Sequence, residues 1–404
     1  MTLIKPHYIL SPHALIENKA IAFDKKIHSI DDFEALHVRF PEAEIIELEK
    51  NSLIMPGLIN THVHLEFSAN KTSLEYGSFM PWLHSVIKNR DDLIAECSDV
   101  CMQKAIDTML HSGITSFGAV SSYGLDLATA GNSAQNVVFF NELIGSQAVM
   151  ADALYSDFLE RLNASKTLKR EGFYPAIAIH SPYSVHPILI KRALELSKNE
   201  KLPLSAHYME SRAEQEWCEH NSGDFAPFFK EFLKQEYAVN SSDEFLSLFE
   251  GFPTLMTHVV HANEKQLEKL HLDNHTVIHC PISNRLLGNG AIDLDALDDA
   301  NIEWLCATDG LSSNYTLNLF EEMKIALFMH HGQDLLPFAH KLLESVTCKA
   351  AQALGLNTGA IQEGKNADML VLNLDETPNE QLALHLILHQ YPIQSVYING
   401  TKAL

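Results

Sequence analysis

The chain has 404 residues, of which 20 % are charged and 46 % are apolar, a composition that excludes wholesale disorder. Its 29 Lys and Arg residues stand against 52 Asp and Glu residues, so the formal net charge is −23. This negative charge argues against nucleic acid or an anionic membrane as the partner and favours a small-molecule ligand. The first residues lack an apolar core behind a basic start, and long apolar runs are absent. We therefore expect a cytoplasmic protein.

Residues 1–55 contain short segments that alternate apolar and polar positions, as half-buried strands do. Examples are HYIL (7–10), AIAF (20–23) and EIIEL (44–48). The same pattern returns at the other end of the chain, in residues 359–404. We therefore predict a small β-sandwich formed by residues 1–55 plus 359–404, which leaves residues 56–358 for a larger domain.

Residues 56–358 alternate short apolar strands with amphipathic helical segments, a pattern typical of parallel βα units. Strands are predicted in chain order at 58–62, 114–120, 136–144, 175–180, 203–207, 254–258, 276–280 and 302–309. Eight such units favour the α/β class and a closed (β/α)8 TIM-type barrel. One connection, residues 211–250, is long and rich in aromatic residues, and we expect a helical insertion there.

Histidines and acidic residues gather where the predicted strands end. In barrels of this type the active site is built at that end of the strands. The residues found there are His62, His64, His180, His207 with Glu210, His258, His279 and Asp309. His62 and His64 alternate on one strand, so they point to the same side, roughly 6.5 to 7 Å apart. Both can reach one metal ion, which a third imidazole and a carboxylate from the rim would complete.

The stretch NTHVHLEFS (60–68) contains two overlapping zinc motifs. His62 and His64 form an H-x-H pair, whereas His64 and Glu66 form an H-x-E pair. The H-x-E pair opens sites of the cytidine-deaminase type, which also need a later P-C-x-x-C segment. The sequence has only Cys280-Pro281, in the reverse order, and it also lacks the H-E-x-x-H motif of metalloproteases. The H-x-H interpretation is the one that remains.

Several motifs of the sequence together resemble those of a known enzyme family. MPGLINTHVHLE (55–66) is similar to the P-G-x-x-x-x-H-x-H signature of the amidohydrolase superfamily. SAHYMES (205–211), THVVHAN (257–263), HCPISNRLLGNG (279–290) and ATDGLSSN (307–314) resemble its later motifs in their usual order. The resemblance implies a metal-dependent (β/α)8 hydrolase, in the branch of adenosine-type, S-adenosylhomocysteine, guanine and chlorotriazine hydrolases.

The resemblance also implies roles for individual residues. His62, His64, His207 and Asp309 would bind one divalent metal ion per chain, with zinc as the first choice and iron or manganese as alternatives. Glu210 would be the acid/base carboxylate and His258 would orient the attacking water. His180 stands where binuclear members carry a carbamylated lysine, which implies one metal ion. Independently of any family, three neutral imidazoles and one carboxylate leave positive charge that lowers the pKa of a bound water toward about 7.

Further segments narrow the resemblance to the aminodeoxyfutalosine deaminases of menaquinone biosynthesis. They include the region after the first strand, AIHSPYSVHP (178–187) and HYMESRAEQEW (207–217). The implied reaction is hydrolytic deamination of an adenine nucleoside whose sugar carries a benzoate-bearing chain. The alternatives are deamination of S-adenosylhomocysteine, methylthioadenosine or adenosine, a more distant guanine, cytosine or triazine hydrolase, and a non-catalytic scaffold.

Such a substrate needs polar groups for the purine, an acceptor for the ribose hydroxyls, an apolar wall for the phenyl ring and a cation for its carboxylate. We expect Glu66 to bind the ribose, and Arg285 or Arg90 to pair with the benzoate, because arginine suits carboxylates. The other expected contacts are His180 with Ser312 or Ser313 for the purine, and Phe79, Trp82 and Leu83 for the wall. We expect a homodimer.

Overall fold

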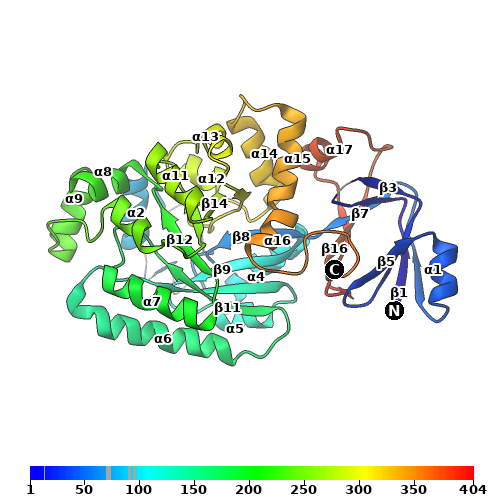
Figure 1. The fold of residues 1–404 in the computed structure, drawn as a ribbon, viewed down its shortest axis with the longest axis horizontal. Coiled ribbons are helices and arrows are strands. Elements are labelled where there is room, and N and C mark those ends of the chain that lie inside the picture. The colour runs from blue at the N-terminus through cyan, green and yellow to red at the C-terminus, as the bar shows by residue number, and fades with distance from the viewer. Residues whose placement is uncertain (13, 70–73, 90–91, 94–96) are drawn as a thin grey trace.

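The computed structural model describes residues 1–12, 14–69, 74–89, 92–93 and 97–404. Its centre is one sheet of eight parallel strands, which follow one another in chain order around the sheet (Figure 1). The strands are β8 (Leu58–Val63), β9 (Ile114–Ser121), β10 (Asn136–Leu143), β11 (Phe173–Ile179), β12 (Leu204–Tyr208), β13 (Leu255–His258), β14 (Thr276–His279) and β15 (Trp304–Cys306). The predicted (β/α)8 barrel is confirmed.

The barrel closes where its last strand meets its first. β15 contacts β8, and the Asn60 amide donates to the Thr308 hydroxyl over 2.7 Å. The backbone N–H of Asp309 donates to the carbonyl of His62 over 3.1 Å. The last strand, Trp304–Cys306, is shorter than the predicted 302–309, and residues 308 and 309 beyond it bond across to β8.

Helices cover the outside of this sheet, so its strands are buried on both faces. Every residue of β9 and β10 is buried, which explains why these strands appear in the sequence as continuous apolar runs. The covering helices are α4 (Asp99–His111), α5 (Leu127–Asn132), α6 (Ala151–Thr167), α7 (Pro187–Glu200), α11 (Glu264–Leu272), α12 (Pro281–Leu286), α13 (Leu294–Asp299), α14 (Leu319–Met329), α15 (Leu335–Ser345) and α16 (Cys348–Ala353). A further helix, α17 (Leu382–His389), packs on α14 and α15.

Both ends of the chain form two further sheets, with α1 (Phe33–Arg39) on one of them. The first has the order β5-β4-β1-β6 and the second β18-β17-β16-β7-β2-β3. Their strands are β1 (Thr2–Lys5), β2 (Tyr8–Leu10), β3 (Leu15–Glu17), β4 (Ala20–Phe23), β5 (Ile27–Asp31), β6 (Glu44–Glu47), β7 (Ser52–Pro56), β16 (Met369–Asn373), β17 (Ile393–Ile398) and β18 (Thr401–Lys402).

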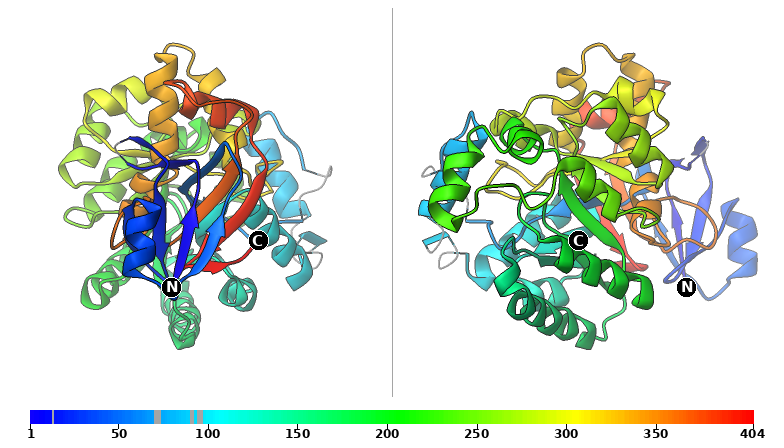
Figure 2. Two further views of the ribbon diagram at one scale, coloured as in Figure 1. Left: turned by 90° about the vertical axis from the view of Figure 1, so that its right-hand side faces the viewer. Right: turned by 60° about the vertical axis from the view of Figure 1, so that its left-hand side comes forward.

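The two small sheets share an apolar core that joins the two ends of the chain. Ile4, Ile21 and Phe23 of the first sheet pack in one cluster with Ile9 and Met369 of the second. Blue and red segments lie side by side there (Figure 2), and β7 pairs antiparallel with β16. We retain residues 1–55 plus 359–404 as a proposed β-sandwich domain and residues 56–358 as a proposed barrel domain.

Helices from two connections lie at the end of the barrel away from the small sheets (Figure 1). One is α2 (Phe79–Lys88), and the others are α8 (Arg212–His220), α9 (Phe225–Phe228), the π-helix η2 (Phe229–Leu233) and α10 (Ser242–Leu248). Phe79 of α2 packs in one apolar cluster with Trp217, Phe225 and Phe229 of the 211–250 connection. Aromatic residues thus hold this connection over the end of the barrel where strand-end side chains emerge.

No helix in the described part of the chain is long and apolar enough to cross a membrane.

Candidate functional site

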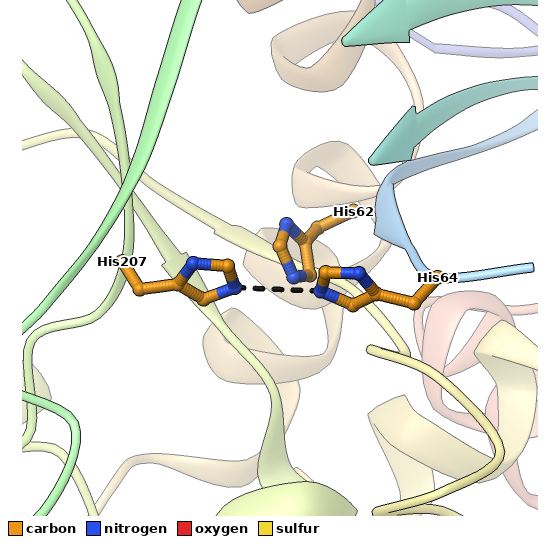
Figure 3. Close-up of side chains that lie close together, drawn as sticks. All are labelled: His62, His64 and His207. Carbon is orange, nitrogen blue, oxygen red and sulfur yellow. Dashed lines mark hydrogen bonds between the residues drawn. The ribbon is translucent and has the colours of Figure 1, made fainter. Parts of the chain in front are cut away.

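Three imidazoles from two strands converge at the carboxyl end of the barrel (Figure 3). His62 and His64 come from the end of β8, and His207 comes from β12. Their ligand nitrogens all lie within 4.8 Å of one another, and the Nε2 atoms of His64 and His207 face each other across 3.4 Å. The structure therefore brings together residues that stand 143 positions apart in the chain.

The hydrogen bonds and burial of these rings leave lone pairs pointing into the cluster. His207 Nδ1 lies 2.9 Å from the carbonyl of His180, and a carbonyl only accepts, so the ring's hydrogen is on Nδ1 and its lone pair on Nε2. The buried Nε2 of His62 has no hydrogen-bond partner among the described residues. Burial lowers the pKa of His62 to about 4 and that of His207 well below its ordinary value. Both rings are neutral at pH 7.

The donor set fits one divalent metal ion. Two ligands of a tetrahedral zinc ion at 2.0–2.1 Å are separated by about 3.3 Å, close to the 3.4 Å between His64 and His207. Asp309 Oδ1 lies 3.7 Å from the Nε2 atoms of both His62 and His64. Its Oδ2 accepts from the hydroxyls of Ser283 and Ser313, each over 2.7 Å. The carboxylate is thus held with one oxygen toward the imidazoles.

Glu210 and His258 lie beside this cluster and face each other. Glu210 Oε1 is 3.6 Å from His258 Nε2 and accepts from the Asn289 amide over 3.2 Å. Burial, and then the negative charge of Asp309, raise the pKa of Glu210 well above its ordinary value, so this carboxyl holds its proton more tightly than an exposed glutamate does. His258 Nδ1 donates to Asn284 Oδ1 over 3.0 Å, which leaves the lone pair on Nε2. The pair combines a proton donor with an acceptor.

Unusual backbone angles turn these side chains inward. Met209, His258 and Asp309 have φ values of 50°, 75° and 60°, a left-handed region that costs energy for residues other than glycine and is found at functional sites. The Glu214 carboxylate accepts from the backbone N–H groups of Met209 over 3.0 Å and of Glu210 over 2.8 Å. These two bonds hold the strained turn that presents Glu210.

Glycine allows the last strand end to approach the first. A Cβ atom on Gly310 would lie 2.9 Å from the Cβ of His64, closer than packed carbon atoms tolerate. The turn that carries Asp309 can therefore lie against His64 only because residue 310 is glycine.

A cavity of about 520 Å³ is lined by His64 and His207 of the cluster and by a set of apolar side chains. His180, Ser312 and Ser313 line it, as do the expected wall residues Trp82 and Leu83, together with Phe79. The indole N–H of Trp82 donates to the carbonyl of Ser312 over 2.8 Å. The structure thus places these six expected substrate contacts around one space.

The structure corrects the role expected of Glu66. Its carboxylate is buried and accepts from the backbone N–H groups of Ser122 over 2.7 Å, of Tyr123 over 3.0 and 3.1 Å, and of Leu125 over 2.7 Å. Glu66 is not among the described residues that line the cavity. Both oxygens are thus occupied in holding the loop after β9, because a strand-end residue can turn toward the neighbouring loop as readily as toward the barrel axis.

Neither expected arginine lies in the described wall of the cavity. Arg285 is exposed on α12, because the turn of helix that buries Ser283 and Asn284 toward the site carries residue 285 to the outside. Arg90 lies outside the described residues. Among the described lining residues there is no lysine or arginine.

Sequence reasoning missed several residues of this cavity. Glu142 at the end of β10 lines it, as do Ser122 and Tyr123 after β9 and Phe228 and Phe229 of the 211–250 connection. The signal for Glu142 was present, because a carboxylate interrupts the apolar run NVVFFNELI (136–144) at a strand end. The others come from loops and helices whose path the strand pattern does not define.

Glu66→Gln is expected to lower the free energy of unfolding by about 1–3 kcal/mol, the penalty for leaving buried donors without an acceptor. The new amide keeps one oxygen, so its NH2 group would face the backbone N–H of either Ser122 or Leu125, both of which the carboxylate now satisfies. Chemical denaturation of both proteins measures the difference. An unchanged midpoint and slope would contradict this assignment of Glu66 as a loop anchor.

The comparisons with known proteins agree with this geometry. The model of the Amidohydrolase family matches residues 53–403. The chain is 50 % identical over 404 residues to the aminodeoxyfutalosine deaminase of a Nitratiruptor species, covering 100 % of this chain and 99 % of that protein. It is 33 % identical over 396 residues to an adenosine deaminase of Helicobacter pylori, covering 96 % of both.

A solved structure is similar over the whole chain. The aminofutalosine deaminase of Helicobacter pylori, in complex with methylthio-coformycin, is 32 % identical with a TM-score of 0.94, and each chain is covered completely. The extent of the family match and the identity over full-length relatives leave one conclusion: this chain belongs to the amidohydrolase family.

Proposed function

We propose that the protein is a metal-dependent hydrolytic deaminase of an adenine nucleoside, converting 6-amino-6-deoxyfutalosine to futalosine. The observation that carries the proposal is Glu210, a buried carboxyl whose pKa is raised well above its ordinary value and which lies 3.6 Å from His258 beside the imidazole cluster. Replacement of an aromatic amine by water requires proton donation to the ring nitrogen as the nucleophile adds, and then to the departing amine.

His62, His64, His207 and Asp309 would hold one divalent ion, with zinc as our first choice and iron or manganese as alternatives. A bound ion of this kind supplies a water acidified toward a pKa of about 7. The single-ion stoichiometry is supported by His207, whose Nδ1 hydrogen is already donated to the His180 carbonyl. That ring therefore has one nitrogen left to serve as a ligand.

The chain's own side chains would move the protons. Glu210 donates to the ring nitrogen next to the carbon that bears the amine, and the neutral Nε2 of His258 accepts a hydrogen bond from the attacking water and so orients it. Asp309 Oδ1, fixed by the two serine hydroxyls on Oδ2, accepts the proton of the water. The amine leaves as ammonia after it gains a proton, so the balance is one water consumed and one ammonia released.

The shape of the cavity supports a nucleoside with a large substituent on its sugar. The lining combines polar groups and imidazoles with a set of apolar side chains, which includes Phe79, Trp82, Leu83, Phe228 and Phe229. This wall suits a phenyl ring. The relative from the Nitratiruptor species, 50 % identical over the whole chain, bears the name aminodeoxyfutalosine deaminase, which supports the same substrate here.

The test compares kcat/KM for aminodeoxyfutalosine, adenosine and 5′-methylthioadenosine, followed by the ultraviolet change from adenine to hypoxanthine. We expect aminodeoxyfutalosine to be preferred by about tenfold or more, since the aromatic tail adds buried apolar contacts. A tenfold preference for plain adenosine would replace this substrate by the simpler nucleoside. Absence of deamination with all three would contradict the reaction class itself.

A further inference from the structure

We propose that Glu142 binds a ribose hydroxyl of the substrate through its Oε1 atom and so determines specificity for the sugar. This inference rests on the proposed deamination of a nucleoside. It assigns the sugar to the third strand of the barrel, where no role was expected, and removes it from Glu66.

Glu142 is a buried carboxylate with one oxygen satisfied and one not. It lies in β10, in which every residue is buried, yet it lines the cavity. Its Oε2 accepts from the hydroxyl of Ser122 over 2.5 Å, whereas its Oε1 has no hydrogen-bond partner among the described residues. A buried carboxylate oxygen without a donor is unfavourable, and a donor from a ligand would remove that penalty.

The imidazole of His207, which lies beside Oε1, cannot serve as that donor. His207 Nδ1 is 3.9 Å away, beyond hydrogen-bond distance, and its hydrogen is donated to the carbonyl of His180 over 2.9 Å. The neighbouring acceptor Oε2 is held in place, because Glu66 anchors the backbone of Ser122 over 2.7 Å. The unpartnered oxygen therefore belongs to a carboxylate that is held in position in the cavity wall.

The place of Glu142 relative to the imidazoles indicates which part of a ligand reaches it. The Nε2 atom of His207 faces His64, whereas its Nδ1 atom lies 3.9 Å from Oε1 of Glu142, so the carboxylate lies on the other side of the imidazole ring from His64. A base whose reacting carbon lies at the imidazole cluster can reach Glu142 only with the group attached to it. In a nucleoside that group is the ribose, whose hydroxyls are donors that suit an ionised carboxylate.

The same surroundings raise a competing possibility. Glu142, His180 and His207 also lie close enough together to hold a cation, with ligand atoms within 4.8 Å. The hydrogen on His207 Nδ1 argues against it, because a protonated nitrogen has no lone pair to offer a metal. The experiment therefore also measures the number of metal ions per chain in wild type and in Glu142→Gln.

The experiment measures kcat/KM of the metal-loaded enzyme on aminodeoxyfutalosine and on its 2′-deoxy and 3′-deoxy forms, for wild type, Glu142→Gln and Glu142→Ala. For wild type, loss of the bound hydroxyl should lower kcat/KM by about 10- to 100-fold, as expected for a hydrogen bond to a charged group. In both variants, the loss in kcat/KM caused by removing the same hydroxyl from the substrate should shrink to less than about threefold. Glu231→Gln, which alters an exposed glutamate of η2, should keep the wild-type penalty.

Each contrary outcome has its own meaning. If wild type deaminates aminodeoxyfutalosine but tolerates the loss of either hydroxyl, or if both variants keep the wild-type penalty, the assignment of Glu142 is overturned while the proposed function stands. Two metal ions per wild-type chain and one in Glu142→Gln would overturn it in favour of a second metal site. If wild type does not deaminate aminodeoxyfutalosine, the proposed function fails and the inference fails with it.

Discussion

Glu210→Gln is expected to lower kcat on the proposed substrate by about 100- to 10,000-fold, the usual contribution of a positioned acid/base group. Glutamine keeps the shape of the side chain and can still accept from Asn289, which now donates to Glu210 over 3.2 Å. It cannot, however, deliver a proton and take it back. Steady-state kinetics with wild type and variant give the ratio directly.

The same variant should keep its bound metal, because Glu210 is not one of the proposed ligands. Elemental analysis of the purified proteins should find equal metal content in wild type and variant. Glu231→Gln is a matched control, since Glu231 is an exposed glutamate of η2 in the same connection, and it should retain wild-type kcat. Near wild-type turnover by Glu210→Gln would remove Glu210 from the proton-transfer role.

His207→Ala is expected to remove the bound metal and to lower kcat by about 1,000-fold or more, since a bound divalent ion contributes several kcal/mol to such reactions. The side chain supplies one of the three imidazole nitrogens that lie within 4.8 Å of one another. Wild type stripped with a chelator should show the same loss. Its activity should return with added zinc, iron or manganese, in proportions that identify the preferred ion.

The exposed histidine at the end of α8 provides the control for this prediction. His220→Ala changes a side chain that is 70 % exposed and should leave both metal content and turnover at the wild-type level. A His207→Ala protein that retains one ion per chain and full activity would contradict the proposed ligand set.

Active-site residues of a parallel barrel lie at the carboxyl ends of its strands, and this regularity explains why so much of the site could be predicted. Parallel strands bring their carboxyl ends to one rim whatever their separation in the chain, so His62, His64, His207, His258 and Asp309 could be grouped from their positions after apolar runs. The alternation of His62 and His64 needs only the two-residue period of a strand. The barrel follows from the same periodicity, because eight alternating strands and helices have few ways to bury both faces of a sheet.

A position at a strand end does not predict a place in the site when neighbouring segments determine the direction of the side chain. Glu66 stands beside the histidines in sequence but turns to the loop after β9, and Arg285 follows buried residues of α12 but is exposed. A carboxylate or a guanidinium at such a position goes where donors or water are available. That choice depends on segments far away in the chain.

Length, composition and motif spacing by themselves determined the fold class, the family resemblance and the cluster of metal-ligand residue types, because these depend on periodic burial and on the order of strand ends. The tertiary structure decided the rest. It placed Glu210, whose pKa is raised by burial, 3.6 Å from Nε2 of His258, with left-handed turns at Met209 and His258. It also left one oxygen of Glu142 without a donor in the cavity wall. Such properties arise from contacts between distant segments, which no local pattern of residues encodes.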